Sequence, residues 1–305
     1  MSEHPRLTGL VARAQERARH GVPALALVHP GDALALQAAA AIRQAGIARP
    51  LLVGHHDEIQ RAADLAAVDL RDFEIVATET GGPAAAQRAV ALAREGAVTM
   101  LMKGSLHTDE LMSAVVSKAD GLRGEGRITH AFVFDLPRYH KLLALADCVV
   151  NIAPDLKTKQ HIVGNAVRLL QALGIAEPKV AVVAAVESVN PAIPATLDAQ
   201  ALVQASQAGQ WPGANVEGPF GFDNAFSAEA ARIKKINSSV AGDADLMIMP
   251  ELNAGNMLYK SFVYVGGGDC AGLVLGAKVP IVLTSRADSA MARLASVALG
   301  VLTVR

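Results

Sequence analysis

Two short segments of the sequence carry side chains that could bind a phosphate-like anion, and the first is MKGSLHTDEL (102–111). It follows an apolar run and precedes a helical pattern, for which Thr108 is the expected N-cap. The Lys-Gly-Ser turn offers an ammonium group, backbone N–H groups and a hydroxyl to an anion. An ordinary capped turn, in which Gly104 supplies a positive φ and Lys103 is solvated, explains the same residues.

The second segment is LTSRADS (283–289), at the end of another apolar run and the start of the last expected helix. Ser285 or Asp288 would serve as the N-cap of that helix, which is their default role. Arg286 is less ordinary, because a cation at a helix N-terminus opposes the macrodipole, whereas its planar guanidinium suits a phosphate. Together the three side chains could supply a hydrogen bond, a phosphate clamp and a base.

Two further segments carry polar residues that could face a cleft. In LNAGNMLYK (252–260), Asn256 and Lys260 are four residues apart and share one helix face, which either lines a cleft or is solvated. In EGPFGFDNAF (217–226), Asp223 either caps the following helix or lines a cleft.

Apolar runs that alternate with helical patterns position these segments. Strand, helix and strand at this interval indicate crossover units in a parallel sheet, and loops at the carboxyl ends of such strands line ligand sites. The expected strands are ALALV (24–28), PLLVG (50–54), FEIVA (73–77), VTMLM (98–102), THAFVF (129–134), DCVVNIA (147–153), KVAVVAAV (179–186), DLMIM (245–249) and VPIVLTS (279–285). The expected helices lie near 32–46, 56–68, 83–96, 157–173, 195–206, 225–238, 253–264 and 288–299.

Two loop segments interrupt this alternation of strands and helices. The basic loop GLRGEGR (121–127) separates two series of strands, so a domain boundary is expected near 127–132. Glycine and proline interrupt WPGANVEGPFGFDNAF (211–226), which is therefore expected to be an irregular excursion.

The composition argues against several classes of protein. Of the 305 residues, 51% are hydrophobic and 4% are aromatic, which suits an Ala- and Val-rich core. The net charge of −1 provides no basic field for nucleic acid or an anionic membrane. The charged N-terminus and the lack of a long apolar stretch predict a cytoplasmic protein, in which Cys148 and Cys270 are reduced thiols.

Motifs for metals and nucleotides are also missing from the sequence. The histidines form no HxxxH or HExxH pattern, so no metal site is expected. GGGD (266–269) is not a GxGxxG fingerprint, and no GxxxxGK[ST] segment occurs, so the usual nucleotide-binding folds are not indicated.

Several segments match one known family in their order and spacing. They are KGSLHT (103–108), NIAPDLKTKQHIVGNAV (151–167), GPFGFDNAFS (218–227), IKKINSSVAGDADLMIMPELNAGNMLYK (233–260) and LTSRADS (283–289). They resemble the phosphate acetyl/butyryl transferase family, and its phosphate butyryltransferase-like branch most. The first hundred residues agree with the family chiefly in their layout of strands and helices.

The resemblance implies a two-domain α/β protein of the isocitrate/isopropylmalate dehydrogenase-like fold, with mostly parallel sheets and an interdomain cleft. The first domain would comprise 1–131 and 273–305, and the inserted second domain 132–272. The implied reaction is the reversible transfer of an acetyl or butyryl group between coenzyme A and inorganic phosphate, which yields an acyl phosphate. Coenzyme A would be a substrate, no metal or redox cofactor would be needed, and the enzyme would be a homodimer.

The Ser-Arg pair of the family falls on Ser285 and Arg286, which are the expected catalytic residues, and Asp288 is added to them as a candidate that replaces a family aspartate or only caps the helix. Arg286 would bind phosphate and offset charge on the carbonyl oxygen. Ser285 would donate a hydrogen bond to the CoA sulfur or the oxyanion, and Asp288 would act as the base. The expected substrate-binding residues are Lys103, Gly104, Ser105, Thr108, Arg127, Asp223, Asn256 and Lys260.

Two positions depart from the acetyl-specific members of the family. An aspartate of those members falls near Ala292, and an arginine falls on Tyr264, so that Lys260 or Arg127 would have to supply an anion contact. Both differences argue against strict acetyl specificity. The alternative functions are a metal- and NAD-dependent dehydrogenase of the same fold and a non-catalytic ligand-binding relative.

Overall fold

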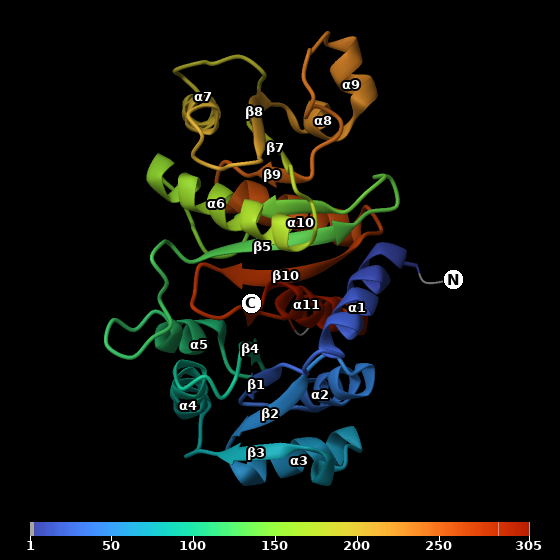
Figure 1. Ribbon diagram of the computed structural model, residues 1–305, viewed down its shortest axis with the longest axis vertical. Helices are drawn as coiled ribbons and strands as arrows, with labels where there is room; N and C mark the ends of the chain where they lie inside the picture. The colour runs from blue at the N-terminus through green and yellow to red at the C-terminus, as the bar shows by residue number, and fades with distance from the viewer. Residues whose placement is uncertain (1–2, 286, 305) are drawn as a thin grey trace. The chain divides into compact units, whose positions relative to one another are not determined.

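The computed structural model describes residues 3–285 and 287–304. The chain divides into two compact units, of which unit 1 comprises Met1–Ile128 and Ala271–Arg305 and unit 2 comprises Thr129–Cys270. Unit 1 is therefore assembled from two separate stretches of sequence. Both units contain helices and mostly parallel strands (Figure 1), so the predicted α/β class is confirmed.

The strands of unit 1 lie in the order β3-β2-β1-β4-β11-β10. Neighbouring strands are parallel, except that β10 and β11 are antiparallel. Parallel neighbours end at the same edge of a sheet, so the loops that follow β1, β4 and β11 emerge together. The bounds are β1 (Ala24–Val28), β2 (Arg49–Gly54), β3 (Glu74–Ala77), β4 (Met100–Lys103), β10 (Asp269–Leu275) and β11 (Ile281–Val282).

Helices cover both faces of this sheet. Figure 1 shows α4 and α5 on one face and α2, α3 and α11 on the other, where α1 packs on α11. The bounds are α1 (Pro5–Ala18), α2 (Ala33–Ala45), α3 (His56–Ala66), the short η1 (Leu70–Asp72), α4 (Gly82–Arg94), α5 (Thr108–Val115) and α11 (Ala290–Thr303).

The strands of unit 2 lie in the order β5-β6-β9-β7-β8, and β5 and β6 form the antiparallel pair. The strand bounds are β5 (Thr129–Asp135), β6 (Leu143–Ala146), β7 (Lys179–Val183), β8 (Asn215–Phe220) and β9 (Leu246–Ile248). The helix bounds are α6 (Leu156–Ala172), α7 (Pro194–Gln207), α8 (Phe222–Phe226), α9 (Ala228–Ile233) and α10 (Leu252–Tyr264).

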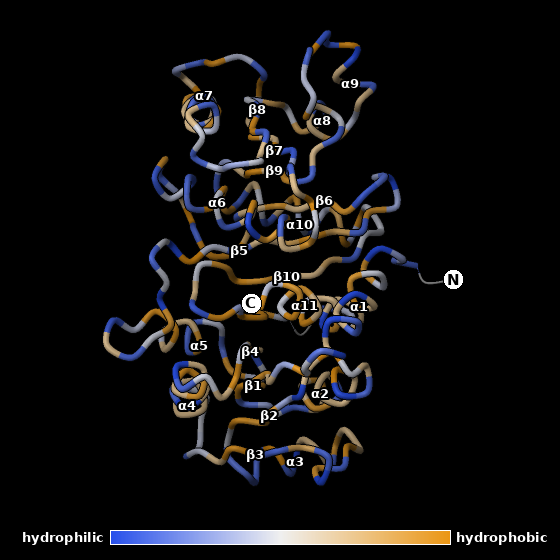
Figure 2. The backbone as a smooth tube through the Cα atoms, viewed as in Figure 1, coloured by the Kyte–Doolittle hydropathy of each residue, from blue (hydrophilic) through white to orange (hydrophobic). Residues whose placement is uncertain are grey.

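Small and branched apolar residues form the core of each unit. In unit 1, alanines of α4 such as Ala85, Ala86 and Ala89 are fully buried against Val28 and Leu101 of the sheet. Figure 2 shows the hydrophobic residues concentrated along strands such as β1 and β10. Burial of this apolar surface is the main source of folding free energy. The alanines also let helices approach the sheet closely, as the composition suggests.

Several expectations about individual elements are wrong. DCVVNIA (147–153) is a loop rather than a strand, because the carboxylate of Asp147 accepts hydrogen bonds from the backbone N–H groups of Val149 and Val150, both at 2.9 Å. The excursion at 211–226 contains β8, and β10 was not expected at all. β8 tolerates Gly218 and Pro219 because it lies at the end of the strand order, where fewer N–H groups are needed for pairing.

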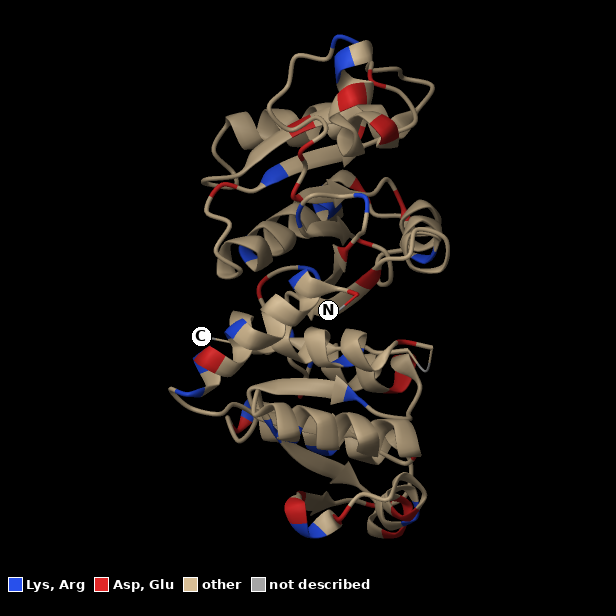
Figure 3. Cartoon of the chain, turned by 90° about the vertical axis from the view of Figure 1, so that its right-hand side faces the viewer, with Lys and Arg blue, Asp and Glu red and all other residues tan. Residues whose placement is uncertain are grey.

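Positive and negative side chains are interspersed along the chain, as Figure 3 shows, which agrees with the net charge of −1. In residues 3–285 and 287–304, no helix has both the length and the apolar character needed to cross a membrane. Cys148 and Cys270 are buried and are not joined in a disulfide, as expected from the sequence.

Candidate functional site

Loops that follow three adjacent strands of unit 1 bring several predicted residues to one edge of its sheet. Val28 of β1 is aligned with Lys103 of β4, and Val282 of β11 is aligned with Met102. The segments that begin after these positions therefore leave the sheet side by side. This edge is where ligands bind in parallel α/β sheets.

The Lys103–Ser105 turn is held by its own polar groups. Lys103 Nζ donates hydrogen bonds to the carbonyl oxygens of Gly104 and Leu106, both at 3.1 Å. Ser105 Oγ donates to His29 O at 2.9 Å and accepts from the N–H of Gly31 at 3.1 Å. The serine hydroxyl thus joins the loop after β4 to the loop after β1.

Gly104 is required at this turn by close packing of the backbone. A Cβ atom at this position would lie 2.5 Å from the carbonyl oxygens of both Val28 and His29. The expectation that Gly104 supplies a positive φ is wrong, since its φ lies outside that range. Only glycine allows the two strand ends to approach so closely.

The N-cap of the helix after this turn lies one residue earlier than expected. α5 starts at Thr108, and its N-cap is His107, whose backbone N–H donates to Glu110 Oε2 at 2.8 Å. The carboxylate of the first turn satisfies this donor, so Thr108 is the first helical residue and is exposed. The prediction of Thr108 as the N-cap is therefore wrong.

The loop after β11 is organised around Ser285, which is exposed. Its backbone N–H donates to Asp288 Oδ2 at 2.7 Å, and its Oγ accepts from the N–H of Ala287 at 3.3 Å. Neither Ser285 nor Asp288 caps α11, because Ser289 does so by accepting from the N–H of Ala292 at 2.8 Å. Arg286, the expected phosphate ligand, lies outside the described residues.

Arg293 lies with Lys103 and Ser285 at this edge of the sheet, although it was not predicted as a site residue from the sequence. Its guanidinium donates to the carbonyl oxygen of Ser285 at 3.1 Å from the first turn of α11. An arginine near a helix N-terminus opposes the helix dipole, which is the signal that could have identified it. A cavity of about 20 Å³ is lined by residues that include Asp32, Lys103, Gly104, Ser285 and Arg293.

The other predicted residues lie elsewhere. Arg127 is exposed near the end of the first stretch of unit 1. In unit 2, Asp223 is exposed beside Lys234 at 3.0 Å, and the hydrogen bond from Lys234 lowers the pKa of Asp223. Asp223 lies within α8, whose N-cap is Gly221, so its predicted capping role is wrong.

The polar pair predicted on one helix face lies on α10 of unit 2. Asn256 is half-buried, and its Nδ2 donates to the carbonyl oxygen of Cys148 at 3.2 Å. This contact ties the helix to the loop after β6. Lys260, one turn further along, is exposed.

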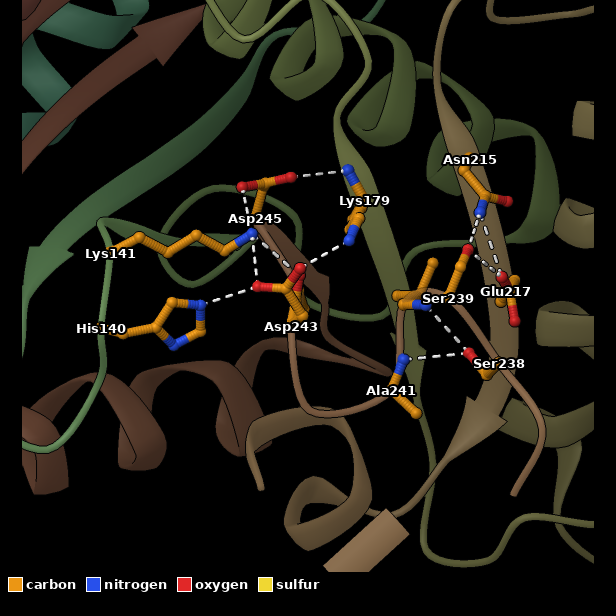
Figure 4. Close-up of polar contacts among 12 residues, drawn as sticks. His140, Lys141, Lys179, Asn215, Glu217, Ser238, Ser239, Ala241, Asp243 and Asp245 are labelled. Atoms are coloured by element: carbon orange, nitrogen blue, oxygen red, sulfur yellow. Dashed lines mark hydrogen bonds and ion pairs between the residues drawn. The ribbon is translucent and has the colours of Figure 1, made fainter. Parts of the chain in front are cut away.

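A larger hollow, of about 890 Å³, lies in unit 2 and includes Lys179, Asn215, Glu217 and Ser239 in its lining. Figure 4 shows these side chains hydrogen-bonded to neighbouring groups: Asn215 Nδ2 donates to Ser239 Oγ at 2.6 Å, and Ser239 Oγ donates to Glu217 Oε1 at 3.1 Å. None of the predicted site residues that the structure describes is in its lining, although Asp223 lies beside it, since Lys234 pairs with both Asp223 and the lining residue Glu187. The predicted residues Lys103, Gly104 and Ser285 gather instead at the strand ends of unit 1.

No group of three or more His, Cys, Asp or Glu side chains suited to hold a metal ion occurs among residues 3–285 and 287–304. The groups gathered at the edge of unit 1 are instead a lysine, an arginine, a serine and backbone N–H groups. Such groups stabilise anions and polarise carbonyl oxygens.

Comparison with known proteins gives a consistent result. Residues 83–301 match the model of the family described as "Phosphate acetyl/butaryl transferase". A phosphate acetyltransferase of Rhizobium meliloti is 49% identical over 286 residues, which cover 93% of this chain and 90% of that protein. A phosphate butyryltransferase of Clostridium acetobutylicum is 41% identical over 271 residues, which cover 89% of this chain and 90% of that protein. The crystal structure of a branched-chain phosphotransacylase from Enterococcus faecalis V583 aligns with a TM-score of 0.81 at 28% identity, over 93% of this chain and 99% of that chain.

Proposed function

The chain belongs to the phosphate acetyl/butyryl transferase family, and we propose that it transfers a short acyl group reversibly between coenzyme A and inorganic phosphate. The observation that carries this function is the 49% identity to a phosphate acetyltransferase over 93% of the chain. The relatives favour this acyltransferase over a dehydrogenase or a non-catalytic binding protein.

The reaction joins two anionic substrates, so much of the catalysis consists of holding them with their reactive atoms together. Arg286 binds phosphate and offsets the charge that develops on the carbonyl oxygen. Ser285 donates a hydrogen bond to the CoA sulfur or to that oxygen. The exposure of Ser285 and the nearby ammonium of Lys103 support this assignment. Asp288 accepts from the Ser285 N–H, which favours a positioning role for Asp288 over the proton-transfer role suggested by the sequence.

The test is the phosphate-dependent release of free CoA thiol from acetyl-, propionyl- and butyryl-CoA. Arg286→Ala should lower kcat/KM by roughly 100-fold or more, because a charge-stabilising donor is lost. Arg88→Ala is the matched control, since Arg88 forms an ion pair with Glu95 at 3.4 Å on the surface of the same unit. Wild-type protein that releases no thiol with any of these substrates, or an Arg286 variant with full activity, would contradict the proposal.

The same assay compares acyl chains. We propose that the enzyme is not restricted to acetyl groups, because Tyr264 and Ala292 stand where acetyl-specific relatives are expected to carry an arginine and an aspartate. Propionyl-CoA and butyryl-CoA should then react at rates within about tenfold of acetyl-CoA, whereas a pocket specific for acetyl groups would discriminate by about 10- to 200-fold per methylene.

We further propose the isocitrate/isopropylmalate dehydrogenase-like fold, with the active site in a cleft between a first domain (1–131 and 273–305) and an inserted second domain (132–272). The interruption of unit 1 by unit 2 supports this proposal. Lys103, Gly104, Ser105, Thr108 and Arg127 would then bind substrate from the first domain. Asp223, Asn256 and Lys260 would do so from the second. A cytoplasmic location remains a prediction from the charged N-terminal sequence.

A homodimer is the proposed assembly. On α10 and just after it, Met257, Tyr264 and Val265 are 65%, 70% and 87% exposed. Apolar side chains gathered in this way on a surface are typical of protein–protein contacts. This surface, which we call the α10 surface, supports the dimer proposed from the family.

A further inference from the structure

His29, directly after β1, has an unusual backbone conformation. Its φ of 51° lies in the left-handed region, which is uncommon for residues other than glycine, although asparagine, aspartate and histidine adopt it more often than most. The conformation is maintained by neighbours, because the His29 N–H donates to Val53 O at 2.7 Å and the His29 carbonyl oxygen accepts from the Ser105 N–H at 2.9 Å. Strained backbone of this kind is concentrated at functional sites.

The imidazole of His29 faces a carboxylate. His29 Nδ1 lies 3.5 Å from Glu58 Oε2, and the two side chains are only 17% and 25% exposed. Glu58 Oε2 is buried, and it has no hydrogen-bond partner among the described residues. The two atoms form no hydrogen bond at this distance, but a carboxylate beside Nδ1 favours the tautomer that carries its proton on Nδ1 and can accept one at Nε2.

Nε2 of the same ring lies near Gly31, next to Ser105. A Cβ atom at Gly31 would lie 3.7 Å from His29 Nε2 and 3.0 Å from Ser105 Oγ. Gly31 therefore places no side chain against Nε2, and the His29 side chain keeps an exposed fraction of 17%. The imidazole thus lies between a carboxylate on one side and a glycine on the other.

The position of His29 fits the proposed site. β1 and β11 flank β4, and neighbouring strands are about 4.8 Å apart, so the loops of His29 and Ser285 are separated by about 10 Å across the Lys103–Ser105 turn. A thiol and a carbonyl group held over that turn would be within reach of both side chains. No other histidine is needed in this arrangement.

We propose that His29, oriented by Glu58, transfers the proton of the CoA thiol in the acyl transfer; this inference rests on the proposed function. When CoA attacks an acyl phosphate, sulfur bonds to the carbonyl carbon and its proton passes to His29 Nε2. The bond between the carbonyl carbon and the phosphate oxygen breaks, phosphate leaves with the electron pair, and His29 returns the proton to it. In the opposite direction, the proton of the attacking hydrogen phosphate passes through His29 to the leaving sulfur.

The acyl transfer requires a group that accepts the thiol proton. A thiol with an ordinary pKa near 8.5 is only a few per cent ionised at pH 7, and the thiolate is the nucleophile. The carboxylate of Asp288 already accepts from the Ser285 N–H. His29 supplies an acceptor at the thiol and a donor for the departing phosphate.

Few charged or titratable groups surround this ring. From α3 comes Glu58, and just before α3 lies His55, whose Nδ1 is buried and has no hydrogen-bond partner among the residues described. From the turn after β4 come Ser105 and Lys103, whose ammonium donates to two carbonyl oxygens. The pH dependence tested below is that of the thiol.

The test compares wild type with His29→Gly, which removes the imidazole and keeps a residue suited to positive φ. In the acylation of CoA by acetyl phosphate, the variant should be about 100-fold slower at pH 7. Its deficit should shrink by several-fold per pH unit up to about pH 8.5, because the thiol ionises without a base. Added imidazole should restore part of the rate at pH 7.

Glu58→Gln should give a smaller loss, of about tenfold at pH 7, with the same dependence on pH. His56→Gln is the matched control, since the His56 side chain is 61% exposed, and it should keep the wild-type rate. His29→Asn, which also tolerates the left-handed conformation, replaces the glycine variant if that variant does not fold.

A deficit that is the same at every pH and is not relieved by imidazole would overturn the role of His29, and so would an unchanged rate. These results differ from a failure of the proposed function, in which wild type itself would show no turnover.

Discussion

The peptide of Ser285 is held from both sides by charged side chains. Asp288 accepts from its N–H at 2.7 Å, and Arg293 donates to its carbonyl oxygen at 3.1 Å. Both contacts involve a charged group, so each is stronger than a hydrogen bond between neutral groups. The serine is therefore placed by residues three and eight positions later in the chain.

Arg293→Met tests whether this placement matters for catalysis. The variant should lower kcat about tenfold with little change in the KM for phosphate, because a misplaced group costs rate even when binding persists. Arg293→Lys should be intermediate, and added guanidinium should partly restore the methionine variant. Steady-state kinetics provide the measurement, with Arg88→Met as the control. A rise in the KM for phosphate at constant kcat would mean that Arg293 binds the substrate itself.

At this scale the sequence predicts which residues gather but not how they interact. Lys103, Ser105 and Ser285 could be predicted because they follow apolar runs that end at one sheet edge. Arg293 and His29 could not, because one contacts a backbone carbonyl and the other is defined by a φ angle and a carboxylate 29 residues later in the sequence.

Elements of unit 2 are joined by a compact ion cluster at the starts of its strands (Figure 4). Asp243, just before β9, contacts His140 Nε2 at 2.7 Å, Lys141 Nζ at 3.0 Å and Lys179 Nζ at 2.5 Å. Lys141 also contacts Asp245 at 2.7 Å. These contacts join the segment before β6 to the first residue of β7 and the approach to β9.

The cluster predicts a pH-dependent contribution to stability. Burial opposes the charge of Asp243, but hydrogen bonds from Lys179, Lys141 and His140 outweigh it and hold the pKa of this carboxyl far below its usual range. A lowered pKa in the folded state stabilises the protein above the unfolded pKa of about 4, and the contribution is lost as pH falls below that value. Its size is limited by solvent screening, because the side chain is 37% exposed.

Asp243→Asn should therefore lower the free energy of unfolding by about 1 to 2 kcal/mol between pH 5 and pH 8. The difference from wild type should shrink below about pH 4. Urea unfolding at several pH values measures it. Asp120→Asn, which breaks an exposed pair with Arg94 at 3.0 Å, should cost less than about 1 kcal/mol. A difference that stays constant down to pH 2.5 would argue against the cluster as its source.

Some elements with a continuous apolar run were predicted closely, but β6 and β10 were missed although they are apolar and mostly buried. β1 has the predicted bounds, because ALALV is buried on both faces. β8 was missed because it contains Gly218 and Pro219, which are favourable in loops and are tolerated here at the end of the strand order. DCVVNIA was mistaken for a strand because its apolar residues conceal the turn formed by the Asp147 carboxylate.

For the whole molecule, the α10 surface predicts association. Wild type should have about twice the chain mass of 31.6 kDa in solution, as measured by light scattering. Tyr264→Glu combined with Val265→Glu should yield a monomer, because two charges would be buried without partners. Leu65→Glu is the control, since Leu65 is 80% exposed on α3. A dimer that persists in the double variant would place the interface elsewhere.

The return of the chain to unit 1 has a consequence during synthesis. Ala271–Arg305 supplies β11, which lies beside β4, and the loop that carries Ser285. While the ribosome has translated only the preceding residues, unit 2 is complete and the sheet of unit 1 lacks an inner strand. Nascent domains fold as their residues emerge. Unit 2 can therefore mature first, whereas the apolar side of β4 stays uncovered and the enzyme remains inactive until the last stretch has been made.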